Sequence, residues 1–69
     1  MTKIDAIRKV MEANGGSATL SEIYKNAKQY KRDIEASESW KAGIRGVLYR
    51  EVREGRNFRK IQDAKYGLI

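Results

Sequence analysis

The chain has 69 residues, with no cysteine and no histidine, and its 15 lysines and arginines against 9 acidic residues give a net charge of +6. This length predicts one domain over residues 1–69 with a small core and no deep substrate cavity, while the lack of cysteine excludes disulfides, thiolate metal sites and thiol redox chemistry. No apolar run approaches the roughly 20 residues of a membrane span, and no secretory leader is recognisable. We therefore expect a cytoplasmic or nucleoid-associated protein that uses no membrane, cofactor or small-molecule substrate.

The first predicted element is a helix over residues 3–14. Its apolar residues recur at helical spacing and are Ile4, Ile7, Val10 and Met11. Thr2 is placed to cap the N-terminus, with Asp5 in the first turn, where a negative charge meets the positive end of the helix dipole. Residues 14–16 (Asn-Gly-Gly) supply a stop signal.

A second helix is predicted over residues 20–30. Thr19 and Glu22 have the spacing of a capping box, in which each side chain bonds the backbone N–H of the other residue. A short extended segment at Ser17 and Ala18 is expected to pair with a later strand. Residues 31–36 (KRDIEA) have no periodicity and are predicted to form a loop, from which Ile34 would reach the core.

The third predicted helix, over residues 38–54, has two contrasting faces. One face is a buried stripe of Trp40, Ile44, Val47 and Leu48. The opposite face consists of Ala42, Arg45, Gly46, Tyr49 and Arg53. A solvated face is ordinarily filled with Glu, Lys and Gln, so this combination of cations, one aromatic and very small residues predicts a surface that another molecule approaches closely. Trp40 is interpreted as a core anchor, because it lies in line with the stripe.

Three residues of this helix need a further reason. Gly43 and Gly46 each lower helix stability by roughly 1 kcal/mol relative to alanine. Gly43 flanks the stripe, where it would admit a neighbouring helix, whereas Gly46 would point outward and let DNA come near the backbone. Alternatively, Ala42 and Gly46 form a small-residue face for a helix of another subunit. Glu51 lies in line with the buried stripe, which predicts that the stripe ends near Leu48 or that the helix bends.

A β-hairpin is predicted over residues 57–69, with a tight tip at Asp63 and Ala64. Its expected core-facing residues are Phe58, Tyr66 and Leu68. Phe58 and Ile61 break strict alternation, so a β-bulge is expected.

The excess of positive charge lies in the second half of the chain. Residues 41–65 contain eight cations and three acids, a surplus of five out of the total of six. Such clustering favours a polyanionic partner. Catalysis is not expected, since the chain has no histidine base, no cysteine nucleophile, no phosphate-binding glycine loop and no acidic cluster spaced for a metal.

Three segments, GGSATLSEIY, SESWKAGIRGVLYR and FRKIQDAKYGLI, resemble the small winged-helix modules at the N-termini of Mrr-like restriction proteins and of related HARE-type domains. The resemblance extends from Ile4 to Leu68. It implies an α+β fold, a three-helix winged helix-turn-helix with a C-terminal hairpin wing. It also implies double-stranded DNA binding, with the third helix in the major groove and the hairpin on the backbone, in a regulatory or DNA-processing and defence setting. The short tip, with only Lys65 beside it, favours backbone contact over insertion into the minor groove.

The predicted DNA-binding residues fall into groups by role. Ser37, Ser39 and Lys41 occupy the first turn of the third helix, where free N–H groups favour a phosphate. Arg45 is the candidate for base contact, because its guanidinium matches two acceptors on a guanine edge. The remaining candidates, for base or backbone contact, are Ala42, Gly46, Tyr49, Arg50, Arg53, Arg59, Lys60 and Lys65. A protein-interaction or homodimerisation module that uses Ala42, Gly46 and Tyr49 is the main alternative, and RNA is a third possible partner.

Overall fold

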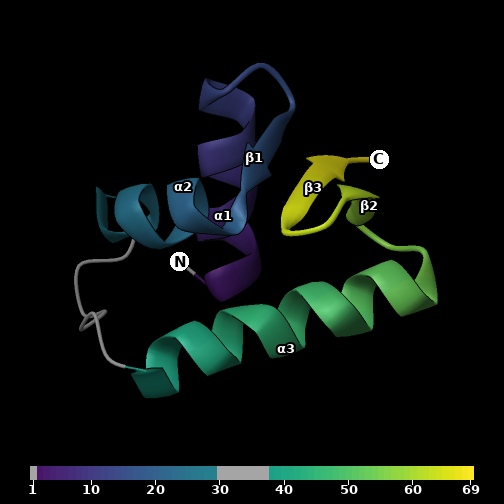
Figure 1. Cartoon of the computed structure of the whole chain (residues 1–69). Coiled ribbons are helices and arrows are strands. Elements are labelled where there is room, and N and C mark those ends of the chain that lie inside the picture. Colours follow the sequence, from purple (N-terminus) through teal and green to yellow (C-terminus); the bar gives the residue numbers. More distant parts are fainter. Residues whose placement is uncertain (1, 30–37) are drawn as a thin grey trace.

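The computed structural model describes residues 2–29 and 38–69, with backbone only for residues 28 and 38. Its elements, in chain order, are α1 (Lys3–Ala13), β1 (Ser17–Thr19), α2 (Leu20–Asn26), the 3-10 turn η1 (Ala27–Gln29), α3 (Glu38–Glu54), β2 (Phe58–Gln62) and β3 (Lys65–Leu68). The long helix α3 runs along one side of the molecule, with α1, α2 and the sheet on its other side (Figure 1). This α+β arrangement of three helices and a small antiparallel sheet is that of a winged helix, as predicted.

The first helix begins with a capping box. The Thr2 hydroxyl accepts from the Asp5 amide and the Asp5 carboxylate accepts from the Thr2 amide, both at 3.2 Å. These hydrogen bonds hold the pKa of the Asp5 carboxyl below its usual value. At the other end, the Gly16 amide returns to the Met11 carbonyl at 2.7 Å, and Gly15 and Gly16 both have positive φ. The predicted start and stop of this helix are confirmed.

The second helix begins as predicted but ends earlier. Thr19 and Glu22 form the expected capping box, with hydrogen bonds of 2.8 and 3.2 Å. The α-helix ends at Asn26, and the chain continues as the 3-10 turn η1 to Gln29. The prediction of one continuous helix to residue 30 is therefore wrong in its second half, because the last turn tightens. The predicted loop at 31–36, with Ile34, lies outside the described residues, as does Ser37.

The three strands form one antiparallel sheet in the order β1-β3-β2. Ala18 of β1 pairs with Tyr66 of β3, so the extended segment predicted before α2 is confirmed. The hairpin has an irregular register between Lys60 and Gln62, which is the expected bulge. Its tip is attached to the body of the domain, because the Leu20 amide donates to the Ala64 carbonyl at 2.8 Å.

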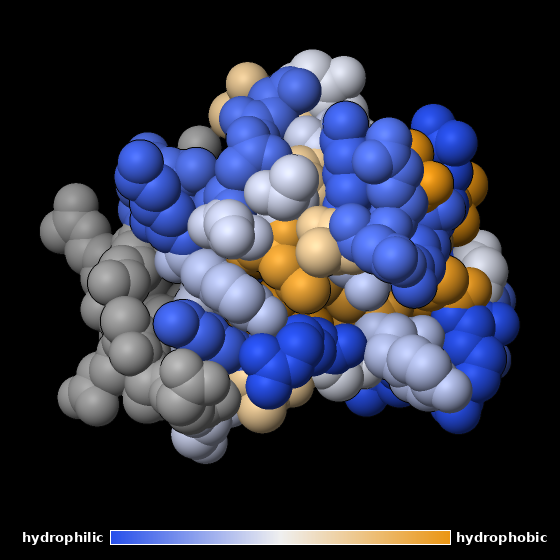
Figure 2. Space-filling view, viewed as in Figure 1, coloured by the Kyte–Doolittle hydropathy of each residue, from blue (hydrophilic) through white to orange (hydrophobic). Residues whose placement is uncertain are grey.

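The core lies between α3 and the layer formed by α1, α2 and the sheet. Its largest fully buried side chains are Phe58, Ile7, Met11, Ile23, Ile44, Leu48 and Val10. Trp40 is 9% exposed and belongs to this core, as predicted, and Tyr66 and Leu68 pack against its edge. Hydrophilic residues cover most of the face shown in Figure 2, and hydrophobic residues show mainly at its centre and toward the C-terminal side.

Candidate nucleic-acid interface

The outward face of α3 carries the residues that the helical spacing places there. Ala42, Arg45, Gly46, Tyr49 and Arg53 are all exposed, whereas Ile44 and Leu48 on the opposite face are fully buried. A Cβ added at Gly46 would meet nothing within 4 Å. The middle of this face is therefore bare backbone next to one methyl group, flanked by a guanidinium and a tyrosine ring.

Near the N-terminal end of α3, two cations gather around Tyr24 of α2. The Arg45 guanidinium donates to the Tyr24 hydroxyl at 3.1 Å, and the Lys41 ammonium lies 5.5 Å from the centre of the Tyr24 ring. The ring itself packs edge-on to Trp40, with 6.3 Å between ring centres. Tyr24 thus connects the core to the charged surface and holds Arg45 in place. Ser39 is exposed in the first turn of α3.

Tyr24 was not expected at this surface. Its helical spacing with Leu20 and Ile23 places it on the apolar stripe of α2, and the ring does lie beside the core. The missed signal is chemical, because a half-buried tyrosine hydroxyl ordinarily needs a hydrogen-bond partner. Here that partner comes from the neighbouring helix.

Near the C-terminal end of α3, a second group forms with the hairpin. Tyr49 is 69% exposed, and the Arg53 guanidinium lies 5.8 Å from the centre of its ring. Lys60 of β2 and Tyr66 of β3 face these two residues across a hollow. Arg53 is also 3.6 Å from Glu54, and Lys60 is 3.7 Å from Asp63.

The other two hairpin cations are not part of this group. Neighbouring residues of a strand point to opposite faces, and Lys60 and Tyr66, which are register partners, face α3. Arg59 therefore points to the other face, where its Nε donates to the Leu68 carbonyl at 3.4 Å. Lys65 lies on that face too, and its charge acts on Glu22 of α2. Of the three cations proposed for the hairpin, the structure brings only Lys60 to the side of Tyr49 and Arg53.

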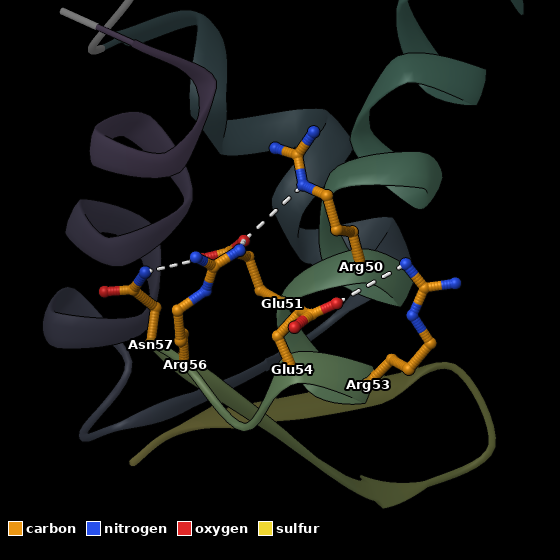
Figure 3. Close-up of polar contacts among 6 residues, drawn as sticks. All are labelled: Arg50, Glu51, Arg53, Glu54, Arg56 and Asn57. Carbon is orange, nitrogen blue, oxygen red and sulfur yellow. Dashed lines mark hydrogen bonds and ion pairs between the residues drawn. The ribbon is translucent and has the colours of Figure 1, made fainter.

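Glu51 corrects a prediction about α3. The helix continues to Glu54, and Glu51 is buried within its inner face, only 3% exposed. Figure 3 shows its carboxylate among Arg50, Arg56 and Asn57. Asn57 donates at 2.7 Å, Arg56 at 3.2 Å, and the Arg50 Nε lies at 3.5 Å. The stripe therefore does not end at Leu48, because a neutralised carboxylate extends it.

This cluster fixes the junction between α3 and the hairpin. The Asn57 hydrogen bond holds the pKa of the Glu51 carboxyl below its usual value; burial opposes this effect, and Arg56 and Arg50 reinforce it. Asn57 also accepts from Arg8 of α1 at 3.1 Å, and its φ of 60° turns the chain into β2. Arg50, predicted at the edge of the DNA-binding face, is thus directed to Glu51.

Two further searches concern other kinds of site. Among residues 2–29 and 38–69, no group of three or more acidic side chains is placed to hold a metal ion. None of the helices in the same ranges combines the length and the apolar character needed to span a bilayer.

Comparison with known proteins gives one finding. Neither the curated proteins nor the solved structures include a match to this chain. The model of one family, described as a helix-turn-helix domain of ASXL proteins and restriction endonucleases, matches residues 1–69. This helix-turn-helix is a DNA-binding domain that is not catalytic by itself. The match covers the whole sequence, and the chain therefore belongs to the HARE-HTH family.

Proposed function

We propose that the domain binds double-stranded DNA by laying the outward face of α3 in the major groove, with the hairpin beside the adjacent backbone. The observation that carries the proposal is the composition of that face: Ala42 and Gly46 leave the helix backbone accessible between Arg45 and Tyr49. The major groove of B-DNA is about 12 Å wide and admits an α-helix. A helix with small residues on its outer side can enter more deeply than one covered by long side chains.

Arg45 is the proposed base-reading residue. Its hydrogen bond to Tyr24 orients the guanidinium, and the loss of side-chain freedom on binding is then smaller. A guanidinium can bond both acceptors of a guanine edge at once, which lysine cannot do. Ser37, Ser39 and Lys41 are proposed phosphate contacts at the start of α3.

The hairpin is proposed to contact the DNA backbone. Lys60 faces the same side as Tyr49 and Arg53, so it can reach a phosphate next to the groove that α3 occupies. The tip is hydrogen-bonded to Leu20, which favours a wing that lies against the backbone over one that inserts into the minor groove. Arg50, Arg59 and Lys65 would contribute general attraction to the duplex.

The salt dependence of binding tests this proposal. With about six phosphates contacted, the plot of log affinity against log salt should have a slope of about −5. Replacing Arg45 with glutamine should weaken binding about tenfold and remove the preference at one base pair. The matched control is Lys9→Gln on the exposed side of α1, which loses the same charge away from the face. A flat salt response, or equal effects of the two variants, would contradict the proposal.

Sedimentation with and without a short duplex separates DNA binding from the alternative use of the same face. A stable dimer that does not bind DNA would show that Ala42, Gly46 and Tyr49 meet a second copy of the chain. Competition between duplex DNA and single-stranded RNA decides between the two nucleic acids. The match to a restriction endonuclease domain favours a role in DNA processing, defence or regulation, close to the nucleoid.

A further inference from the structure

A hollow of about 280 Å³ lies between the C-terminal half of α3 and the hairpin. Tyr49, Val52 and Arg53 line it from the helix, and Lys60 and Tyr66 line it from the strands. Val52 and Tyr66 are half-buried, whereas Tyr49, Arg53 and Lys60 are exposed. The hollow therefore has an apolar and aromatic floor and a rim that combines an aromatic ring with two cations.

This lining does not suit a lone phosphate. A phosphate is bound by several charged donors that converge on it, but each cation of the rim already has an acid nearby. Arg53 lies 3.6 Å from Glu54, and Lys60 lies 3.7 Å from Asp63. The floor supplies the flat surface of Tyr66 and the methyl groups of Val52, which favour a flat, weakly polar ring.

A nucleobase has these properties. Proteins bind unpaired bases by stacking them on aromatic side chains, and arginine strengthens such sites through cation–π contact. Tyr49 and Arg53 already form that combination, at 5.8 Å, and the rim cations would lie toward the phosphate of the same nucleotide.

We propose that this hollow receives one unstacked base of DNA that lies next to the bound duplex. The inference rests on the proposed function and deepens it, because the preferred ligand becomes a duplex with an unpaired base, as at a bulge, mismatch or strand end. A base that is already unpaired avoids the energetic penalty of leaving the stack. The expected preference for such DNA over the fully paired duplex is about tenfold.

The test compares two labelled duplexes that are identical except for one unpaired 2-aminopurine in the middle of one strand. Fluorescence anisotropy gives both affinities, and 2-aminopurine emission reports stacking on an aromatic ring. Wild type is expected to bind the bulged duplex about tenfold more tightly and to quench its emission. Val52→Phe fills the floor of the hollow and retains every cation, so it should abolish both the preference and the quenching.

A second variant keeps the test decisive if Val52→Phe does not fold. Tyr49 is exposed, so Tyr49→Leu removes the stacking ring without opening the core and should bring the two affinities to within about twofold. Lys9→Gln, on α1, should retain the full preference. Equal wild-type affinities for the two duplexes would overturn the inference, as would a preference that survives in both hollow variants.

The outcomes separate this inference from the proposed function. Salt-dependent binding of the paired duplex without any preference would overturn the inference alone. Binding of the bulged duplex only, with loss in Tyr49→Leu, would support the hollow and contradict recognition of paired DNA. Absence of binding to either duplex would overturn both.

Discussion

Gly46 offers a sharp test, because one substitution is expected to move stability and DNA binding in opposite directions. It lies in the middle of α3, is exposed, and has nothing within 4 Å of the position of an added Cβ. Gly46→Ala should therefore gain the full helix-propensity difference of about 1 kcal/mol without steric conflict. For a domain of this size, that gain raises the melting temperature by about 4–8 °C.

The same methyl group would stand between the helix backbone and the DNA. We expect Gly46→Ala to weaken duplex binding several-fold, and the larger Gly46→Gln to weaken it about tenfold or more. Thermal unfolding by circular dichroism gives the stability change, and anisotropy with a duplex gives the affinity. The reasoning is refuted if the alanine variant gains stability and binds DNA as well as wild type, because the glycine would then serve no close approach.

Two other glycines provide matched controls. A Cβ at Gly43 would come within 2.7 Å of the Lys3 ammonium, the flexible end of a side chain, so Gly43→Ala should gain less stability than Gly46→Ala and leave DNA binding unchanged. Gly55 has a φ of +71°, and Gly55→Ala should lower stability by about 1 kcal/mol.

Three further predictions concern stability. The lowered pKa of Glu51 contributes stability above its unfolded value of about 4.5 that is lost as the pH falls through the folded pKa; melting temperatures between pH 7 and pH 3 should therefore depend less on pH in Glu51→Gln, and an unchanged profile would contradict this. Ala64 has a φ of 58°, so Ala64→Gly should raise the free energy of unfolding by about 1 kcal/mol in urea titrations; a decrease would show that the turn is not strained. Phe58→Ala should remove about 3–5 kcal/mol from a total of roughly 3–10 kcal/mol for a chain of this length and leave much of the protein unfolded; a cooperative near-native melt would disprove the central place of this ring.

Local chemistry explains which parts of the fold could be predicted from the sequence. The caps at Thr2 and Thr19 follow from residues three positions apart, and a stripe such as Ile44 and Leu48 follows from helical spacing. The bulge in β2 was visible as a break in alternation at Ile61. These features depend only on near neighbours along the chain.

The features that were missed depend on the path of the chain. Glu51 is acceptable in the core because the backbone turns at Asn57 and returns two donors to its carboxylate. Arg59 and Lys60 were grouped together, although Phe58 on the inner face already implied that they point apart. The place of Lys65 required the register of the hairpin, and the place of Tyr24 required the packing of α2 on α3, neither of which is encoded locally.

Mapping a duplex onto the domain by amide chemical shifts tests the central claim most directly. An ¹⁵N-labelled sample titrated with a short DNA duplex should show its largest shifts at Ala42, Gly46 and Tyr49 on α3, smaller ones at Lys60, and little change at Lys9 and Glu12 on α1. Largest shifts on α1, with the outward face of α3 unaffected, would contradict the account.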